Sequence, residues 1–247
     1  MLDYNREADQ YDATRGGEPR ATAAADAVLG LIPEGAVRLL DVACGTGIVT
    51  RRLAAGRPGL RVTGADLAYE MTRRSHARLP GSVVLADSRR LPFQDETFDA
   101  VTSIWLLHLV ERPEDARAVV AECARVLRPG GVYITTVDKA AAHDVGSDVD
   151  AVLAGRPIHP APDAAQEVHA YAAACGLTPA GQARFPGLGQ GRSPRQAIGN
   201  LRRGWFSALP SGDPLTERFA ARLEELPDMD RRRADPVFTL RAFRRSM

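Results

Sequence analysis

The chain has 247 residues, 45% of them hydrophobic and 26% charged, and its 32 basic side chains nearly balance 31 acidic ones to give a net charge of +1. A chain of this length and composition builds a substantial core, which excludes a small scaffold held together by disulfides or a metal. The balanced charge excludes an acidic disordered chain and a strongly basic protein that wraps nucleic acid.

The cysteines and the apolar segments indicate the cellular setting. Cys44, Cys123 and Cys175 lie far apart and lack CxxC spacing, so we expect neither a disulfide framework nor a zinc site. The N-terminal residues contain no apolar stretch typical of a signal peptide, and no run of about 18 apolar residues is present to span a bilayer. We therefore expect a cytoplasmic location, no metal and no membrane partner, and make no prediction of oligomeric state.

Strand and helix patterns alternate through the first half of the chain. A polar N-terminal stretch is followed by an amphipathic helix over about 21–32, which ends at a Pro-Glu-Gly turn. Strands are predicted at 37–42, 60–65, 83–86, 98–104 and 132–137, with helices at about 47–55, 68–79 and 113–127. This alternation predicts an α/β fold with a doubly wound, mostly parallel sheet.

The pattern is looser after residue 138 and resumes near residue 164. We expect a helix at 164–175, a strand at 177–185, two helices at 194–209 and 214–226, and a last strand at 237–243. The two helices would form an insertion before the last strand, giving seven strands in one domain over 1–247. Its expected parts are an N-terminal helical cover (1–35), a core (36–138), a linker with a helix and the sixth strand (139–191), a helical insertion or lid (192–230) and the last strand (231–247).

A glycine turn after the first predicted strand is the sharpest local signal. Gly45 and Gly47 permit a tight turn and close approach of a ligand to the backbone. With Thr50 and the later Asp66, their spacing resembles the fingerprint that binds a nicotinamide or flavin dinucleotide. Two residues count against a dinucleotide: Thr50 replaces the expected glycine or alanine, and Asp41 would repel a diphosphate but attract an ammonium group.

Further acidic and hydroxyl groups follow another strand. Asp87 and Ser88 come directly after the third predicted strand and suit the amino group of an adenine. Together with Asp41 and Asp66, they indicate a ligand with a cationic end, a ribose and an adenine.

At this point the sequence resembles the class I S-adenosylmethionine-dependent methyltransferases, in the branch of small-molecule and natural-product enzymes. The resemblance extends from about Tyr4 to Val137 and is looser beyond. It is carried by five segments in the same order as in the family: 40–47 (LDVACGTG), 64–71 (GADLAYEM), 86–93 (ADSRRLPF), 97–99 (TFD) and 125–131 (RVLRPGG). The resemblance also implies an antiparallel last strand.

The resemblance implies S-adenosylmethionine as cofactor and assigns its parts to particular residues. Ala43 stands where the family usually has glycine. The implied contacts are Asp41 and the backbone of Ala43, Gly45, Thr46 and Gly47 for the methionine part, Asp66 for the ribose, Leu67 and Met71 for the adenine ring, Asp87 and Ser88 for its amino edge, Ile104 and Trp105 for the amino-acid portion, and Tyr11 and Arg15 for the carboxylate.

Two histidines are candidate general bases, because an alcohol or phenol acceptor would be helped by a base that titrates near neutrality. His108, just past the fourth strand, is the first candidate, and His143, past the fifth, is the second. The competing interpretations are a hydrogen-bonded histidine without proton transfer for His108 and a solvated loop histidine for His143. Three apolar residues of the insertion could cover a substrate pocket or pack in a core: Trp205, Phe206 and Leu209.

The sequence thus predicts methyl transfer from S-adenosylmethionine to a small organic acceptor, without selecting oxygen, nitrogen or carbon as the methylated atom. A second hypothesis is an RNA methyltransferase, because arginines such as Arg231, Arg232 and Arg233 are in excess near the C-terminus. Asp228, Asp230 and Asp235 flank this triplet, so we interpret it as a solvated face and do not expect a nucleic-acid partner. Two further hypotheses stay open: a protein that uses S-adenosylmethionine for a different reaction, such as a rearrangement, and a nicotinamide oxidoreductase.

Overall fold

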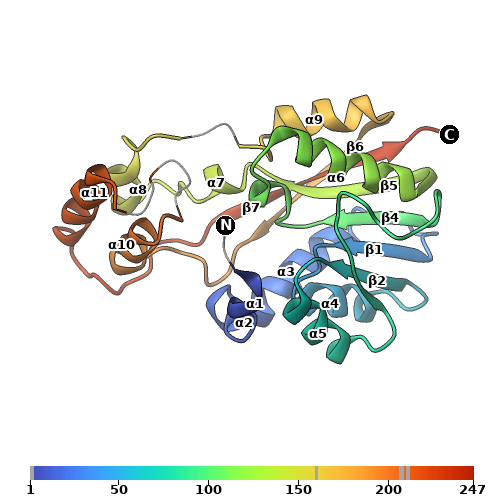
Figure 1. The fold of residues 1–247 in the computed structure, drawn as a ribbon, viewed down its shortest axis with the longest axis horizontal. Helices are drawn as coiled ribbons and strands as arrows, with labels where there is room; N and C mark the ends of the chain where they lie inside the picture. The colour runs from blue at the N-terminus through green and yellow to red at the C-terminus, as the bar shows by residue number, and fades with distance from the viewer. Residues whose placement is uncertain (1–2, 159–160, 206–208, 210–211) are drawn as a thin grey trace.

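The computed structural model describes residues 3–158, 161–205, 209 and 212–247. Over these residues the chain forms a seven-stranded sheet of order β3-β2-β1-β4-β5-β7-β6, covered by helices (Figure 1). The strands are β1 (Arg38–Val42), β2 (Arg61–Asp66), β3 (Val83–Leu85), β4 (Phe98–Ser103), β5 (Leu127–Val137), β6 (Leu177–Pro186) and β7 (Val237–Arg245).

The sheet is mostly parallel and reverses direction only at its last strand along the chain. β1 pairs in parallel with β2 and β4, β2 with β3, and β4 with β5, whereas β7 runs antiparallel to both β5 and β6. The strand order changes direction at β1, so the carboxyl ends of β1, β2 and β4 flank the switch point where open α/β sheets bind ligands. The predicted doubly wound sheet and antiparallel last strand are confirmed.

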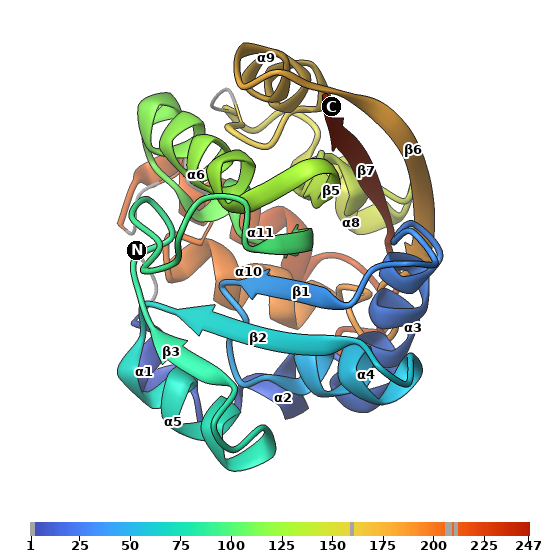
Figure 2. The same cartoon turned by 90° about the vertical axis from the view of Figure 1, so that its right-hand side faces the viewer.

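Helices cover both faces of the sheet (Figure 2). One face is covered by α3 (Gly17–Leu29), α4 (Ile48–Gly56) and α5 (Tyr69–Arg78), and the other by α6 (Pro113–Val126) and α9 (Ala165–Ala174). Successive strand residues point to opposite faces: Leu39 packs in the core beneath α3 and α4, and Leu40 in the core beneath α6 and α9. Burial on both faces explains why the central strands are continuous apolar runs.

A third group of helices lies beyond the carboxyl end of the sheet, away from the strands in Figure 1. It contains α8 (Asp148–Leu153), α10 (Pro194–Arg202) and α11 (Pro214–Glu224), which share their own hydrophobic core. The insertion of α10 and α11 before β7 was predicted. The sequence pattern missed α8, because one and a half turns are too short for a periodic signal; a capping box between Ser147 and Asp150 starts this helix.

Other short elements also differ from the prediction. The polar N-terminus contains α1 (Tyr4–Glu7) and α2 (Tyr11–Thr14), and further short helices follow β4 and β5 as η1 (Leu107–Leu109) and α7 (Lys139–Ala142). α10 ends at Arg202, earlier than the predicted 209.

β5 begins earlier than the predicted strand at 132–137, because the segment 128–131 also lies within it. Gly130, with a φ of 77°, and a register shift between Phe98 and Ala100 absorb the irregularity. Asp99 holds this end together, since its carboxylate accepts hydrogen bonds from the backbone N–H groups of Val37 and Arg38 and from the Arg128 guanidinium.

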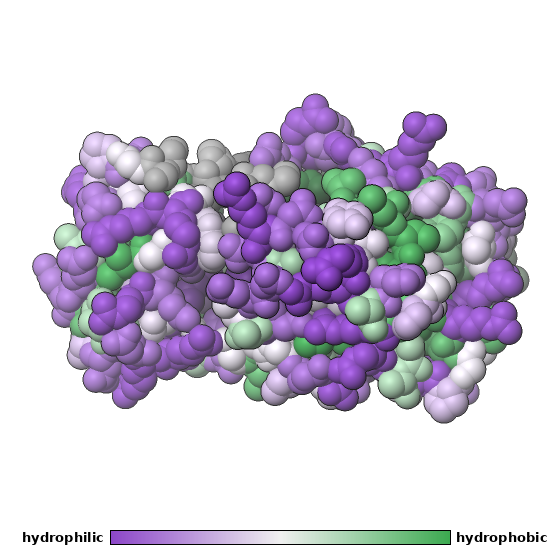
Figure 3. Space-filling view, turned by 60° about the horizontal axis from the view of Figure 1, so that its bottom comes forward, coloured by the Kyte–Doolittle hydropathy of each residue, from purple (hydrophilic) through white to green (hydrophobic). Residues whose placement is uncertain are grey.

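The molecular surface is mainly hydrophilic on the face drawn in Figure 3, with separate smaller hydrophobic areas. In the part of the chain that the structure describes, no helix has both the length and the apolar character needed to cross a bilayer.

Candidate cofactor site

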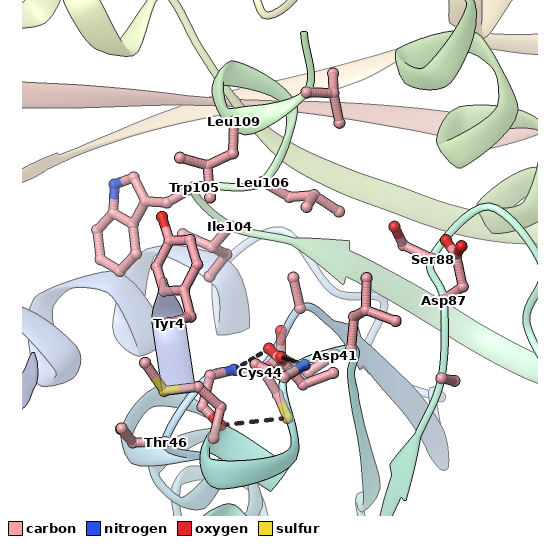
Figure 4. Close-up of a pocket in the computed structure, with 18 of the residues that line it drawn as sticks. Tyr4, Asp41, Cys44, Thr46, Asp87, Ser88, Ile104, Trp105, Leu106 and Leu109 are labelled. Carbon is pink, nitrogen blue, oxygen red and sulfur yellow. Dashed lines mark hydrogen bonds between the residues drawn. The ribbon is translucent and has the colours of Figure 1, made fainter. Parts of the chain in front are cut away.

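A cavity of about 640 Å³ opens at the carboxyl ends of β1, β2 and β4, the switch point of the sheet. Its wall is formed by the turns after these strands, by the segment after β3 and by the N-terminal helices. In Figure 4, Tyr4 and Trp105 lie at one end, Asp87 and Ser88 at the other, and Asp41 between them at the base. The volume is that of a typical small-molecule site.

The structure places twelve of the fourteen predicted cofactor residues in this wall, and two outside it. Those in the wall are Tyr11, Asp41, Ala43, Gly45, Thr46, Asp66, Leu67, Met71, Asp87, Ser88, Ile104 and Trp105. Gly47 and Arg15 lie outside the wall, as do the two candidate bases, His108 and His143.

The turn after β1 shows why small residues stand there. Ala43, Gly45 and Gly47 have φ values of 57°, 56° and 75°, in the left-handed region that favours glycine. A Cβ at Gly47 would overlap the Ser75 hydroxyl, so this glycine lets α5 pack against the turn. A Cβ at Gly45 would meet open space, so the backbone there is exposed to the cavity.

Asp66, at the end of β2, is held by two backbone groups. Its carboxylate accepts hydrogen bonds from the N–H of Gly45 at 2.8 Å and from the N–H of Ala68 at 2.9 Å. Burial raises the pKa of this carboxyl, and these hydrogen bonds act in the opposite direction. Each oxygen keeps a lone pair, so the fixed carboxylate can accept two further hydrogen bonds from a ligand.

Asp41 is only 3% exposed and lies under the turn. Its two oxygens accept hydrogen bonds from the hydroxyls of Thr50 at 2.6 Å and Thr102 at 2.9 Å. Burial raises the pKa of Asp41 to about 6, although both hydroxyls lower it. Thr50, which departs from the dinucleotide fingerprint, therefore has a local purpose: it supports an acidic group at the base of the cavity.

At the other end of the cavity, Asp87 is paired with an arginine. The Arg89 guanidinium donates to both Asp87 oxygens and also to Asp115. These hydrogen bonds lower the pKa of Asp87, which is therefore ionised near neutrality. Ser88 stands beside it in the cavity wall (Figure 4), so this end offers both an acceptor and a donor to a heterocycle.

Arg20 is a wall residue that the sequence analysis missed. It is 4% exposed, its Nε atom has no hydrogen-bond partner, and its guanidinium lies 4.0 Å from the centre of the Trp105 ring. A buried cation with unsatisfied hydrogen bonding is costly unless a ligand completes it. The sequence signal was present: Arg20 occupies the buried face of α3, whose other buried residues are alanines and a valine.

The N-terminal helices are fastened over the cavity by polar contacts. Asp12 of α2 accepts hydrogen bonds from the Thr46 hydroxyl in the glycine turn and from Arg78 of α5, both at 2.6 Å. Asn5 of α1 accepts a hydrogen bond from the backbone N–H of Glu70. These contacts hold Tyr4 in the cavity wall, near Trp105 and Ile104 (Figure 4).

Arg15 and Trp205 contact each other outside the cavity wall. Arg15 stacks on Tyr11 and on Trp205, with distances of 5.9 and 5.2 Å from its guanidinium carbon to the ring centres. Trp205 is thus beside the N-terminal cover, Leu209 is buried in the core of α8, α10 and α11, and Phe206 lies outside the described residues.

The two candidate bases are neutral. Burial and the neighbouring cations Lys139 and Arg15 hold the pKa of His108 well below its usual value. Burial, Arg192 and Lys139 lower the pKa of His143 to about 2. Such weakly basic imidazoles are poor proton acceptors, so the local electrostatics disfavour proton transfer by either histidine.

Residues 40–135 match the family described as a methyltransferase domain. The chain is 40% identical over 100 residues to the ubiquinone/menaquinone biosynthesis C-methyltransferase UbiE of Desulfotalea psychrophila, a match that covers 39% of each chain. It is 37% identical over 114 residues to a ubiquinone biosynthesis O-methyltransferase of Xanthomonas oryzae pv. oryzae, covering 42% of this chain and 45% of the relative. The matched segments thus span about two fifths of the length of these curated relatives.

The fold is shared over the whole chain with solved structures. A chain from the complex between the Haloferax volcanii methyltransferase activator Trm112 and a methyltransferase covers 100% of both chains, with a TM-score of 0.63 and 19% identity. At this identity the likeness concerns the fold alone.

Proposed function

We propose that this chain is a class I S-adenosylmethionine-dependent methyltransferase that transfers a methyl group to a small organic acceptor, because residues 40–135 match a methyltransferase domain. One observation carries the proposal: a single cavity combines the buried Asp41 carboxylate and the half-buried Asp66 carboxylate with the buried, incompletely hydrogen-bonded Arg20. This pattern is complementary to a ligand that has an ammonium group, ribose hydroxyls and a carboxylate.

The residues of the wall fit the parts of the cofactor in order. We infer that Asp66 accepts hydrogen bonds from the ribose hydroxyls and that Asp87 and Ser88 meet the adenine edge. Asp41 lies beneath the turn at the methionine end and supplies negative charge to the ammonium group. Arg20, rather than Arg15, is assigned to the methionine carboxylate, because Arg20 lines the cavity and Arg15 does not.

The reaction needs alignment more than acid–base machinery. When bound, the cofactor supplies an activated methyl group: the acceptor's electron pair forms the new bond to carbon, the carbon–sulfur pair stays on sulfur, and a proton carried by the acceptor leaves to solvent. The chain's contribution is to fix the geometry and exclude water. Tyr4, Ile104 and Trp105 would do this at the methionine end, where they form an apolar wall.

The arginine-rich C-terminal part gives no support to an RNA substrate. Arg195 pairs with Asp230, Arg202 with Glu217, and Arg233 with Asp148, at 2.6 to 2.9 Å. Guanidinium groups engaged by neighbouring carboxylates offer little net charge to phosphates. A small acceptor therefore remains the better proposal.

The acceptor class is tested with S-adenosylmethionine labelled in its methyl group. Purified protein is offered bacterial RNA in one reaction and a mixture of aromatic acids, phenols and amines in another. We expect label only in the small-molecule fraction, with equal formation of S-adenosylhomocysteine. Labelled RNA would overturn the assignment.

Cofactor affinity is expected to depend on pH through Asp41. Its pKa of about 6 means that raising the pH from 5 to 7 ionises most of this carboxyl and improves the attraction for an ammonium group. Binding of S-adenosylhomocysteine should tighten by about tenfold over this range. Calorimetric titrations at several pH values measure it.

The stability of the ligand-free protein changes in the opposite direction. Because the pKa of Asp41 is raised in the folded state, the free energy of unfolding decreases as the pH rises from 5 to 7. Asp41→Asn, which keeps the shape, should flatten the pH dependence of affinity. An unchanged dependence in Asp41→Asn would assign it to another group.

Release of the N-terminal cover is expected to speed cofactor dissociation. Asp12→Ala removes the two hydrogen bonds that the Asp12 carboxylate accepts, one from the Thr46 hydroxyl and one from the Arg78 guanidinium. If the free energy that holds the cover over the cavity falls by roughly 1.5 kcal/mol, S-adenosylhomocysteine should be released about tenfold faster. Stopped-flow displacement measures this rate, and Asp26→Ala is the matched control, since Asp26 is an exposed carboxylate of α3 outside the cavity wall. Equal rates for both variants would refute a closing role.

A further inference from the structure

The segment that follows β4 lines the cavity with apolar side chains. Those in the wall are Ile104, Trp105, Leu106, Leu109 and Val110. The short helix η1 explains the spacing, because residues three apart lie on the same side of a 3₁₀ helix, and Leu106 and Leu109 stand at its two ends. Leu107, between them, is fully buried in the core beneath α6. The segment therefore turns one apolar side, defined by Leu106, Leu109 and Val110, toward the cavity.

The protein covers this apolar side only in part. Leu109 and Val110 are half-buried, and both lie in the wall. Apolar surface in contact with water is unfavourable, so a ligand that covers it gains binding free energy. In Figure 4, Leu106 and Leu109 lie on the side of the cavity away from Asp41, which is at the base under the glycine turn. The space in front of η1 is thus distinct from the base of the cavity.

Tyr4 stands at the edge of the same space. It belongs to α1, which is tied to α5 by the hydrogen bond from the Glu70 backbone N–H to the Asn5 side chain. In Figure 4 its hydroxyl points toward Leu109 and away from Asp41. Burial raises the pKa of Tyr4 well above its usual value, so the hydroxyl stays protonated. A neutral hydroxyl can both donate and accept a hydrogen bond.

The charged side chains around this space have partners or tasks of their own. Arg89 is paired with Asp87 at the adenine end, and the exposed Asp3 is paired with Arg6. Arg20 is assigned to the carboxylate of the cofactor. A charged acceptor in front of η1 would therefore lose its hydration without gaining a free partner of opposite charge. An uncharged acceptor avoids this cost.

We propose that the methyl acceptor is an uncharged, predominantly apolar molecule that lies between Tyr4 and the apolar side of η1. The Tyr4 hydroxyl is its hydrogen-bond partner, and Leu109 selects against charge. An acceptor in this position lies beside Ile104 and Trp105, at the methionine end where the methyl group is transferred. The inference rests on the proposed function, which assigns the rest of the cavity to the cofactor.

Matched probes test the preference for an uncharged ligand. The protein is first saturated with S-adenosylhomocysteine, and failure of that binding, measured by calorimetry, would refute the proposed function itself. Three pairs of probes, similar in shape and different in charge, are then titrated: 2-naphthol with 2-naphthoate, indole with indole-3-carboxylate, and methyl cinnamate with cinnamate. We expect at least one neutral probe to bind about tenfold or more tightly than its carboxylate.

Two variants locate the bound probe. Leu109→Asp should weaken the preferred neutral probe by about tenfold or more and leave the affinity for S-adenosylhomocysteine unchanged. Leu109→Asn is a milder variant with the same expected direction, should the aspartate impair folding. Tyr4→Phe should weaken the same probe by about fivefold through the lost hydrogen bond. The matched control is Leu85→Asp, at an exposed leucine of β3 outside the wall, which should change neither affinity.

Three results would overturn the proposal. The first is equal affinity within all three pairs, or no binding of any neutral probe to the saturated protein. The second is a preference for the neutral probe that stays unchanged in both Leu109 variants. The third is displacement of S-adenosylhomocysteine by the neutral probes, because the space in front of η1 would then belong to the cofactor.

Discussion

Arg20→Met is expected to weaken S-adenosylhomocysteine binding by about 2 to 3 kcal/mol, or roughly 30- to 150-fold, without destabilising the free protein. The guanidinium is buried, lies on the Trp105 ring and leaves Nε without a partner. A ligand carboxylate would complete it through charged hydrogen bonds. In the free protein the cost of burying this charge outweighs its favourable interactions with Tyr11 and Asp12 and lowers its pKa, so replacing it with an apolar side chain of similar length should leave the unfolding free energy equal or higher.

Arg20→Met should lower the ligand affinity without lowering the stability of the protein. Arg57→Met is the informative control, because it should do the reverse. Arg57 donates hydrogen bonds to the carbonyls of Leu29, Ile32 and Pro33 after α3, far from the cavity wall. Its loss should lower the melting temperature and leave the affinity unchanged. Calorimetry and thermal unfolding on both variants separate binding from stability. An Arg20→Met protein with normal affinity would remove Arg20 from the cofactor site.

Asp66→Ala is expected to weaken the same ligand by about 1 to 3 kcal/mol, or roughly 5- to 150-fold, and to destabilise the protein as well. The carboxylate has two tasks: it holds the N–H groups of Gly45 and Ala68, and it faces the cavity. Removing it leaves two donors without partners and takes away the acceptor that the ribose hydroxyls would use. Isothermal titration measures the affinity, and denaturant unfolding measures the stability.

Asp99→Ala separates these two tasks. Asp99 also accepts two backbone hydrogen bonds, from Val37 and Arg38, but it lies at the amino end of β1 and β4, away from the cavity. The two variants should lose stability to a similar degree, and only Asp66→Ala should lose affinity. If both variants lost the same affinity, the loss in Asp66→Ala would be explained by its lower stability and not by a missing contact with the ligand.

Local patterns were sufficient to predict the sheet and most of the cavity. Each central strand is an apolar run bounded by turn residues. The glycine turn follows β1, Asp66 ends β2, and Asp87 lies two residues after β3. In a parallel sheet these ends meet at one edge, so residues predicted separately lie in one wall.

Contacts between distant segments explain what was missed. Arg20 belongs to the site only because α3 packs beside Trp105. The two residues are distant in sequence and are brought together by the packing of α3 on the sheet. The fastening of α2 through Asp12 to Thr46 and Arg78 depends on tertiary geometry in the same way. His108 was the first candidate base because an imidazole ordinarily titrates near neutrality and this one follows the fourth strand. Its low pKa follows from burial and from cations that other elements contribute.

The most direct test of the account is a calorimetric titration of ligand-free protein with S-adenosylhomocysteine and, separately, with NADH, repeated on Asp66→Ala. We predict saturable binding of S-adenosylhomocysteine at one site per chain, weakened in Asp66→Ala, and no binding of NADH, whose diphosphate would lie near the Asp41 carboxylate. Binding of NADH alone, or of neither ligand, would contradict the assignment of the cavity to S-adenosylmethionine.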